Sequence, residues 1–423
     1  MVMELAEAFR TGTQTPDDHL EQCLRRIAER DNQLRAWVSV DAAGARYAAA
    51  ESTARWRSGR PLGRLDGIPV GVKDIIDLDG QVTSVGVDGW SDEPARADAA
   101  IVARLREVGA VVAGKTVTTP FACFDPPPTC HPKRSNCTPG GSSSGSAVSV
   151  ADGHVPWALG SQTGGSIVRP AAYCGIVGFK PTFGRLPTEG VFPIAPHLDH
   201  LGFLCRDAHS ACVIWETLAG EPVTLPNTLK VGLLDDVQRT RAESQLLESF
   251  RRVVERCREA GLEAEPVVLP FDWGELLQCH GTIMAKEAAQ THARWYAQRR
   301  PLYRRGMVSL LERGRSVSSR EYEDALERQR AWKAELERWW GSAGVDLLVM
   351  LSTPTTAPSR RDTTGDPSFN SPWSLLGVPT LTIPVGRAAD GLPVGLQWIG
   401  RSGRDVDVLG AGWWCRSRGV CRP

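Results

Sequence analysis

Residues 140–182 read GGSSSGSAVSVADGHVPWALGSQTGGSIVRPAAYCGIVGFKPT and contain two glycine-rich turns, each with serine beside it. Taken alone, the first turn could be a flexible linker, because Gly/Ser-rich segments usually are. It leads, however, into a small-residue segment at 144–151 that favours a helix, then into a strand pattern at 155–163 and a second turn at 161–170. Glycines in both turns would let the backbone approach a ligand closely. We therefore interpret this stretch as a folded site.

Two familiar kinds of glycine-rich site do not fit the stretch. A phosphate-binding P-loop needs a lysine after its second glycine, and no lysine lies between Lys133 and Lys180. Residues 141–145 match the GxSxG nucleophile elbow, with Ser143 at its centre. That elbow follows a strand and needs a late histidine, but PPPTCHPKRSNCTPG precedes the serines and the last histidine is His292. We interpret the GxSxG match as a coincidence.

A serine pair with a lysine base fits the stretch better. Ser142 and Ser166 each lie beside flexible backbone, and the helix and strand between them could return the chain to the same edge of a sheet. A serine nucleophile needs a base. Lys73 ends the apolar strand pattern 67–74, where desolvation would favour its neutral form. Each of the three residues also has an ordinary structural explanation, such as a helix cap for the serines.

The rest of the chain alternates between helix and strand patterns. Helices are predicted within residues 1–60, and a strand–helix–strand pattern begins at Gly67. Residues 208–345 are mostly helical, with one βαβ-like unit at 229–269, and strand patterns return within 346–410. We predict an α/β fold, with a sheet covered by helices, in a single domain, residues 1–423, whose core at 65–207 contains Lys73 and both glycine turns.

Composition narrows the possible partners. The 423 residues carry 49 basic and 49 acidic side chains, which gives no general attraction to nucleic acid or to an anionic membrane. The first residues lack a secretory pattern, no segment is apolar enough to span a bilayer, and the 11 cysteines are scattered. We expect reduced thiols and a cytoplasmic protein. Cys123, Cys130 and Cys137 do not have the usual zinc spacing, so we expect no metal site there.

The stretch 140–182 resembles the signature of the amidase signature family. LDGIPVGVKD (65–74) is similar to the lysine motif of that family, and FNSPWSLLGVPTLTIPVG (369–386) with GLPVGLQWIG (391–400) is similar to its C-terminal strands. The resemblance extends from the first helix to about residue 410. It implies a central mixed sheet between helical layers, with a helical insertion.

The resemblance implies a Ser–Ser–Lys triad and amide hydrolysis through a serine acyl-enzyme. Ser166 would be the nucleophile, Ser142, after a cis peptide bond, the bridging serine, and Lys73 the base. The backbone N–H groups of Thr163, Gly164, Gly165 and Ser166 would hold the oxyanion. Ser143 would support the site by hydrogen bonding. The chemistry needs no metal or organic cofactor, and the expected partner is a small-molecule amide.

The chain departs from the family pattern at several positions, one of which is Ser144, where many members have glycine. Gln162 stands where many members have an acid; we expect its amide to hold the turn and the enzyme to remain active. Val168 replaces an arginine, and Arg169 follows it. Residues 410–423 are short, aromatic and basic, so we expect a divergent or truncated end of doubtful stability instead of the family's final amphipathic helix.

The sequence does not identify which amide is the substrate. Segments 119–135 and 270–370 are expected to line the pocket, whereas Trp273, Trp295 and Trp373 are more readily explained as core residues. The resemblance leaves two alternatives to a free-standing amidase, the glutaminase subunit of the tRNA-dependent amidotransferase and a catalytically silent member of the fold. A homodimer is also left open.

Overall fold

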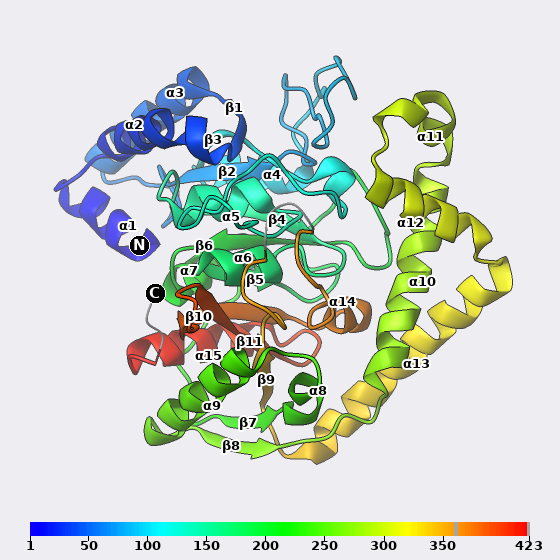
Figure 1. The fold of residues 1–423 in the computed structure, drawn as a ribbon. Helices are drawn as coiled ribbons and strands as arrows, with labels where there is room; N and C mark the ends of the chain where they lie inside the picture. The colour runs from blue at the N-terminus through cyan, green and yellow to red at the C-terminus, as the bar shows by residue number, and fades with distance from the viewer. Residues whose placement is uncertain (359–362, 421–423) are drawn as a thin grey trace.

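The computed structural model describes residues 1–358 and 363–420, and this part of the chain is built around one mixed sheet (Figure 1). Its strand order is β1-β3-β2-β4-β6-β5-β10-β11-β9-β7-β8. The strands are β1 (Trp37–Val40), β2 (Pro69–Lys73), β3 (Val111–Thr116), β4 (Trp157–Gln162), β5 (Val177–Lys180), β6 (His200–Cys205), β7 (Lys230–Leu233), β8 (Glu263–Pro266), β9 (Leu347–Leu351), β10 (Thr380–Arg387) and β11 (Pro393–Ile399).

Helices precede, connect and follow these strands. The α-helices are α1 (Val2–Thr11), α2 (Pro16–Leu34), α3 (Ala42–Arg57), α4 (Ala100–Glu107), α5 (Ser144–Ala151), α6 (Val168–Cys174), α7 (Ala208–Ala219), α8 (Asp235–Arg239), α9 (Ser244–Glu259), α10 (Trp273–Thr291), α11 (Ala293–Arg299), α12 (Arg305–Ser316), α13 (Ser319–Ala343), α14 (Ser371–Leu376) and α15 (Asp405–Ser417). Two short 3₁₀ helices lie at Pro120–Ala122 and Arg300–Leu302.

The centre of the sheet is buried on both faces, which explains its continuous apolar runs. β2 pairs in parallel with β3 and β4, and all of its residues are buried. On one face, Ala147 of α5 belongs to the same apolar cluster as Ala158 of β4. On the other face, Trp215 of α7 packs edge-on against Phe179 of β5. The predicted α/β fold, with helices on both faces of a mixed sheet, is confirmed.

Residues 208–345 contribute more than helices to the fold. β7 and β8 pair in parallel around α9 and extend the sheet at one edge, as the βαβ-like pattern at 229–269 predicts. Helices α10 to α13 lie together beside the sheet (Figure 1). α10 packs against α12, α13 and α14, and it places this helical layer beside the second glycine turn.

The end of the described chain differs from the prediction. Instead of a divergent or truncated tail, the structure has α15, which packs on α7 and β10. Trp414 and Cys415 are buried, and a Cβ on Gly412 would lie 2.4 Å from the Leu381 side chain. Glycine is a weak helix former, so the local pattern hides this helix, but its small size allows the close packing that stabilises it. Residues 421–423 lie outside the described part.

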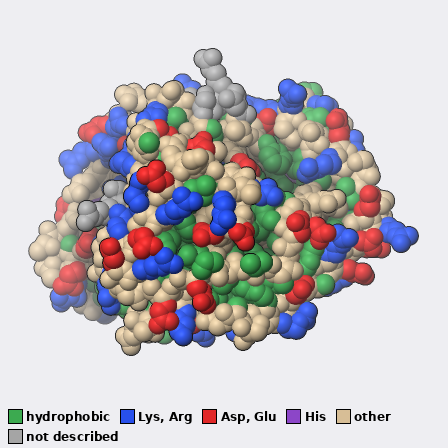
Figure 2. Space-filling model, turned by 60° about the horizontal axis from the view of Figure 1, so that its bottom comes forward, with side chains coloured by type: hydrophobic (Ala, Val, Ile, Leu, Met, Phe, Trp, Pro, Cys, Tyr) green, Lys and Arg blue, Asp and Glu red, His purple; other side chains and the backbone are tan. Residues whose placement is uncertain are grey.

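One face of the molecule carries charges of both signs. On the face drawn in Figure 2, basic and acidic side chains are interspersed around a hollow that is lined by apolar side chains. None of the helices in the described residues is both long enough and apolar enough to cross a membrane.

Candidate active site

Lys73 ends β2 with a fully buried side chain. Its Nζ donates hydrogen bonds to Ser142 Oγ at 2.7 Å and to Ser161 Oγ at 2.8 Å. Within residues 1–358 and 363–420, no carboxylate forms an ion pair with this amine. Burial lowers the pKa of Lys73 from 10.5 to about 7, because the ammonium form is disfavoured away from water. A neutral amine that can accept a proton is therefore present near neutral pH.

Ser142 and Ser166 open into the same cavity. Ser142 lies just before α5 and follows a cis Gly141–Ser142 peptide bond, while Ser166 lies in the turn between β4 and α6. Both line a cavity of about 330 Å³. In the described residues, no hydrogen bond joins the two hydroxyl groups, so the contact already formed is the one between Lys73 and Ser142.

Ser143 lies inside the protein and holds the two turns together. Its side chain is fully buried, and its hydroxyl both donates to the Ser161 carbonyl and accepts from the Ser161 amide at 3.3 Å. Its backbone N–H donates to the Ser166 carbonyl at 3.2 Å. Ser143 does not line the cavity, and its hydroxyl is hydrogen-bonded inside the protein.

The turn at residues 163–166 has fixed carbonyls and unused amides. In the described part of the chain, the N–H groups of Gly164, Gly165 and Ser166 donate to no protein acceptor. The carbonyls accept from four different groups: Thr163 from His280 Nε2 at 2.9 Å, Gly164 from Ser374 Oγ at 2.8 Å, Gly165 from Arg169 N at 2.9 Å and Ser166 from Ser143 N at 3.2 Å. With its carbonyls held elsewhere, the turn can offer amides to an anion.

Gln162 stabilises the same turn, as the sequence predicts. Its Oε1 accepts hydrogen bonds from the amides of Ile167 and Val168, at 2.9 and 3.0 Å. Its Nε2 donates to Ser374 Oγ at 3.1 Å. A carboxylate could accept the same two amides, but it could not donate to the serine. The neutral side chain therefore replaces the acid and also connects the turn to α14.

Three residues near the site were missed in the sequence. Ser161 contacts Lys73 directly, and its position inside the quoted stretch was an available signal. Asp199 accepts a hydrogen bond from Thr163 Oγ1 at 2.6 Å, and burial raises its pKa to about 6. His280 holds the Thr163 carbonyl from α10. Neither Asp199 nor His280 belongs to a recognisable motif, because each reaches the turn from a distant element.

The cavity walls include the two segments that were expected to line the pocket. Residues from 119–135 and from 270–370 line it, as predicted. Trp273, Trp295 and Trp373 are not among the lining residues. They lie in the fold's apolar core or against its edge.

The three cysteines of the 123–137 loop are not a cluster. Cys123 lines the cavity, whereas Cys137 packs against Tyr173 and Leu392. Among the described residues, no group of three potential ligand side chains is placed to bind a metal ion.

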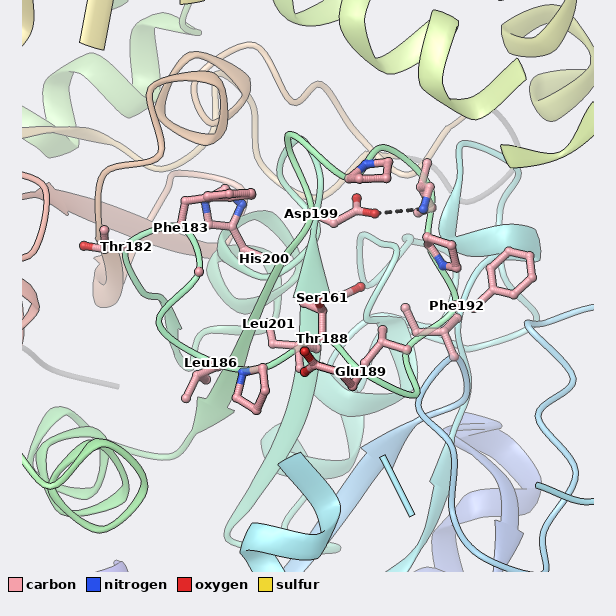
Figure 3. A pocket seen from close by; sticks show the side chains of 17 residues that line it. Ser161, Thr182, Phe183, Leu186, Thr188, Glu189, Phe192, Asp199, His200 and Leu201 are labelled. Atoms are coloured by element: carbon pink, nitrogen blue, oxygen red, sulfur yellow. Dashed lines mark hydrogen bonds between the residues drawn. The ribbon is translucent and has the colours of Figure 1, made fainter. Parts of the chain in front are cut away.

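A second cavity, of about 350 Å³, adjoins the Lys73 hydrogen-bond network (Figure 3). Phe183 and His200 lie at one end and Phe192 at the other, with Ser161 between them. Asp199 also lines it. The Thr163–Asp199 hydrogen bond and the two hydrogen bonds of Lys73, to Ser142 and to Ser161, therefore connect the two cavities.

The chain is similar to known proteins over most of its length. The amidase family model matches residues 18–409. AmiD of Mycobacterium tuberculosis, a putative amidase by its description, is 32% identical over 94% of this chain and 90% of its own length. A glutamyl-tRNA(Gln) amidotransferase subunit of Anaeromyxobacter sp. strain K is also 32% identical, over 90% of this chain and 88% of its own. A crystal structure described as an amidase superposes with a TM-score of 0.90 at 32% identity and covers 99% of both chains.

The chain therefore belongs to the amidase family, the class of enzymes that hydrolyse C–N amide bonds.

Proposed function

We propose that this chain hydrolyses a carboxylic amide to the acid and ammonia or an amine, with Ser166 as nucleophile, Ser142 as relay and Lys73 as base. The observation that carries the proposal is the buried amine of Lys73, bonded to Ser142 in the wall of the cavity where Ser166 lies. Burial keeps the pKa of this lysine at about 7, close to the value at which a general base works best in neutral solution.

The proposed proton path uses the Lys73–Ser142 contact and requires Ser166 Oγ to approach Ser142 Oγ as the reaction begins. Ser166 Oγ attacks the amide carbon and gives its proton to Ser142 Oγ, as Ser142 gives its own proton to Lys73 Nζ. The same path returns a proton to the leaving nitrogen, which departs as ammonia or an amine and leaves an ester on Ser166. Water then attacks that ester, with Lys73 and Ser142 again removing a proton. The acid leaves and Ser166 recovers its proton.

The turn at Thr163, Gly164, Gly165 and Ser166 is the proposed oxyanion hole. Its unused amides would stabilise the negative oxygen of each tetrahedral intermediate. A single oxyanion-hole donor contributes about 3–4 kcal/mol to such intermediates. The donors need to be in place before reaction, and the four carbonyl hydrogen bonds of the turn supply that rigidity.

A second candidate function is that of the glutaminase component of an amidotransferase. It is favoured by the identity to the glutamyl-tRNA(Gln) amidotransferase subunit, which extends over most of both chains. That function would require a partner protein to receive the ammonia. A free-standing amidase would act alone, in the cytoplasm on our proposal, and would need no nucleic acid. Ammonia release from glutamine by the isolated chain, together with the mass of the purified assembly, separates the two.

The test is covalent labelling with a fluorophosphonate, followed by intact mass and peptide mapping. We expect one adduct at Ser166, absent in Ser166→Ala. The matched control is Ser143→Ala, in the neighbouring buried serine, which should keep the adduct. A label on Ser143, or no label in a folded protein, would overturn the proposed nucleophile and favour a silent fold.

A further inference from the structure

The second cavity, of about 350 Å³, differs from the active-site cavity in the charge of its walls. Glu189 and Asp199 line it, and among the described residues its lining includes no lysine or arginine. The active-site cavity is lined by Arg169 and Arg313 together with Asp366. A cavity lined by one sign of charge attracts the opposite sign. A small cation is therefore favoured in the second cavity over the cavity that contains the serines.

Three acceptor groups of the second cavity are open to a ligand. The Glu189 side chain is exposed and forms no hydrogen bond or ion pair in the described part of the chain. Asp199 accepts from the Thr163 hydroxyl and from two backbone amides, but no cation of the described residues pairs with it. His200 Nδ1 donates to the Leu198 carbonyl at 2.6 Å, and burial lowers the pKa of this histidine well below its usual value. The neutral ring leaves Nε2, which has no hydrogen-bond partner in the same residues, as an acceptor.

The rest of the wall is apolar and aromatic. Phe183 and Phe192 lie at opposite ends of the cavity, and Glu189 lies between Leu186 and Phe192 in the view of Figure 3. Ile75 and Leu201 add buried aliphatic surface. Aromatic rings attract ammonium ions, and aliphatic surface favours hydrocarbon. The walls therefore suit an ammonium ion that carries one aromatic ring or a short apolar chain.

The second cavity contacts the proposed base through a hydroxyl group. Ser161 lines the cavity, and its Oγ accepts a hydrogen bond from Lys73 Nζ at 2.8 Å. Burial is the main influence on the pKa of Lys73 and lowers it to about 7, and the negative charge of Asp199 acts against burial by raising it. A cation bound beside Asp199 would offset that negative charge. Lys73 would then stay neutral to a lower pH.

Other titratable groups near Lys73 and Asp199 do not supply this positive charge. Burial raises the pKa of the Cys123 thiol to about 12, so Cys123 is neutral at the pH where Lys73 titrates. The remaining charged groups nearby are already bonded inside the protein: Asp74 to Lys115 at 2.9 Å, and Glu287 to His197 at 2.7 Å. A ligand in the second cavity can therefore change the charge balance around the base.

We propose that the second cavity is a regulatory site for an organic ammonium ion with a small apolar or aromatic body, and that this ion acts on Lys73 through Ser161 and Asp199. This inference rests on the proposed function, and it adds a means of regulating the same base. The ammonium group donates to Glu189 and Asp199, and the apolar body lies against the aromatic rings. By linkage, the ion weakens proton binding to Lys73, and protonation of Lys73 weakens binding of the ion by the same factor.

The first experiment is calorimetric titration of phenethylamine, an ammonium ion at pH 8, compared with 2-phenylethanol, which has the same ring and chain but no charge. We expect the wild type to bind the amine about tenfold more tightly than the alcohol, by the usual strength of a charge-assisted hydrogen bond. Glu189→Gln should weaken amine binding about threefold and Glu189→Lys about tenfold.

Glu93→Lys is the matched control for this titration. Glu93 is also exposed, and it lines a neighbouring cavity of about 480 Å³ but not the second cavity. Glu93→Lys should keep the wild-type affinity for phenethylamine. Equal affinity for the amine and the alcohol, or a loss in Glu93→Lys that Glu189→Lys does not show, would overturn the proposed site.

The second experiment tests the action on Lys73 and does not depend on hydrolysis. Between pH 6 and 8, the affinity for phenethylamine should rise about threefold more in the wild type than in Lys73→Met, because only the wild type loses a proton from this amine. Identical pH dependence of binding in the two folded proteins overturns the action on Lys73, whatever the activity.

The third measurement is the initial rate of amide hydrolysis with saturating phenethylamine. The rate should rise about threefold at pH 6 and stay unchanged at pH 8, where Lys73 is already neutral. An unchanged or lower rate at pH 6 in an active enzyme overturns the regulation. If no amide is hydrolysed and Ser166 is not labelled, yet the binding differences are seen, the proposed function fails while the ammonium site stands.

Discussion

Replacement of Lys73 by methionine tests the proposed base most directly. Lys73→Met keeps the length of the buried side chain and removes only the amine that contacts Ser142 and Ser161. Loss of a positioned base lowers the rate by about 10²- to 10⁴-fold, so kcat/KM should fall by that range. In the wild type, kcat/KM should rise tenfold per pH unit up to about pH 7 and then level off, because only the neutral amine accepts a proton.

The same substitution should change how stability depends on pH. The unfolded chain protonates Lys73 below pH 10.5, whereas the folded protein does so only below about 7. Between these values the unfolded state binds the extra proton, so wild-type stability rises with pH. The full difference corresponds to about 5 kcal/mol in the free energy of unfolding. Below pH 7, protonation of Lys73 causes no further change in the free energy of unfolding. The Lys73→Met variant lacks this contribution to the pH dependence of stability at every pH.

Guanidinium unfolding between pH 6 and 10, together with initial rates of ammonia release, measures both effects. Lys180→Met is a matched control, because Lys180 is also fully buried with a pKa lowered to about 7, but it contacts the carbonyls of Pro181 and Val378 instead of the serines. This control should show the same change in stability and keep the wild-type pH–rate profile. A flat profile from pH 5.5 to 8 in the wild type, or identical pH dependence of unfolding in Lys73→Met and wild type, would refute the reasoning.

Two further substitutions test the supports of the site and the end of the chain. Gln162→Ala leaves the amides of Ile167 and Val168 without their acceptor, which costs about 1–3 kcal/mol for each amide. Denaturant titration should therefore show a lower free energy of unfolding, and steady-state kinetics should show a lower kcat. An unchanged kcat would mean that the turn does not depend on the Gln162 side chain. Trp414→Ala should lower the free energy of unfolding by about 3–5 kcal/mol, because the Trp414 side chain is only 1% exposed. Activity per folded molecule should be retained, because Trp414 is far in sequence from the serines. A loss below about 1 kcal/mol would show that α15 is not part of the core.

Much of the fold could be predicted from local patterns. The strands that carry the site, such as β2 and β4, are short runs of consecutive apolar residues, and such runs predict a buried strand. The capping box that begins α2 at Thr15 is also local. The final helix α15 could not be predicted this way, because its glycines weaken the helical pattern and become favourable only when packed against β10.

The sequence by itself determined the strands, the two glycine turns and the serines and lysine proposed as catalytic. Their residue types and spacing can be recognised within short segments of the chain. Only the tertiary structure decided what surrounds them. The Thr163 and Gly164 carbonyls are held by His280 and Ser374, which are 117 and 210 residues away in the chain. Contacts over such separations depend on how whole elements pack, and no local pattern records them.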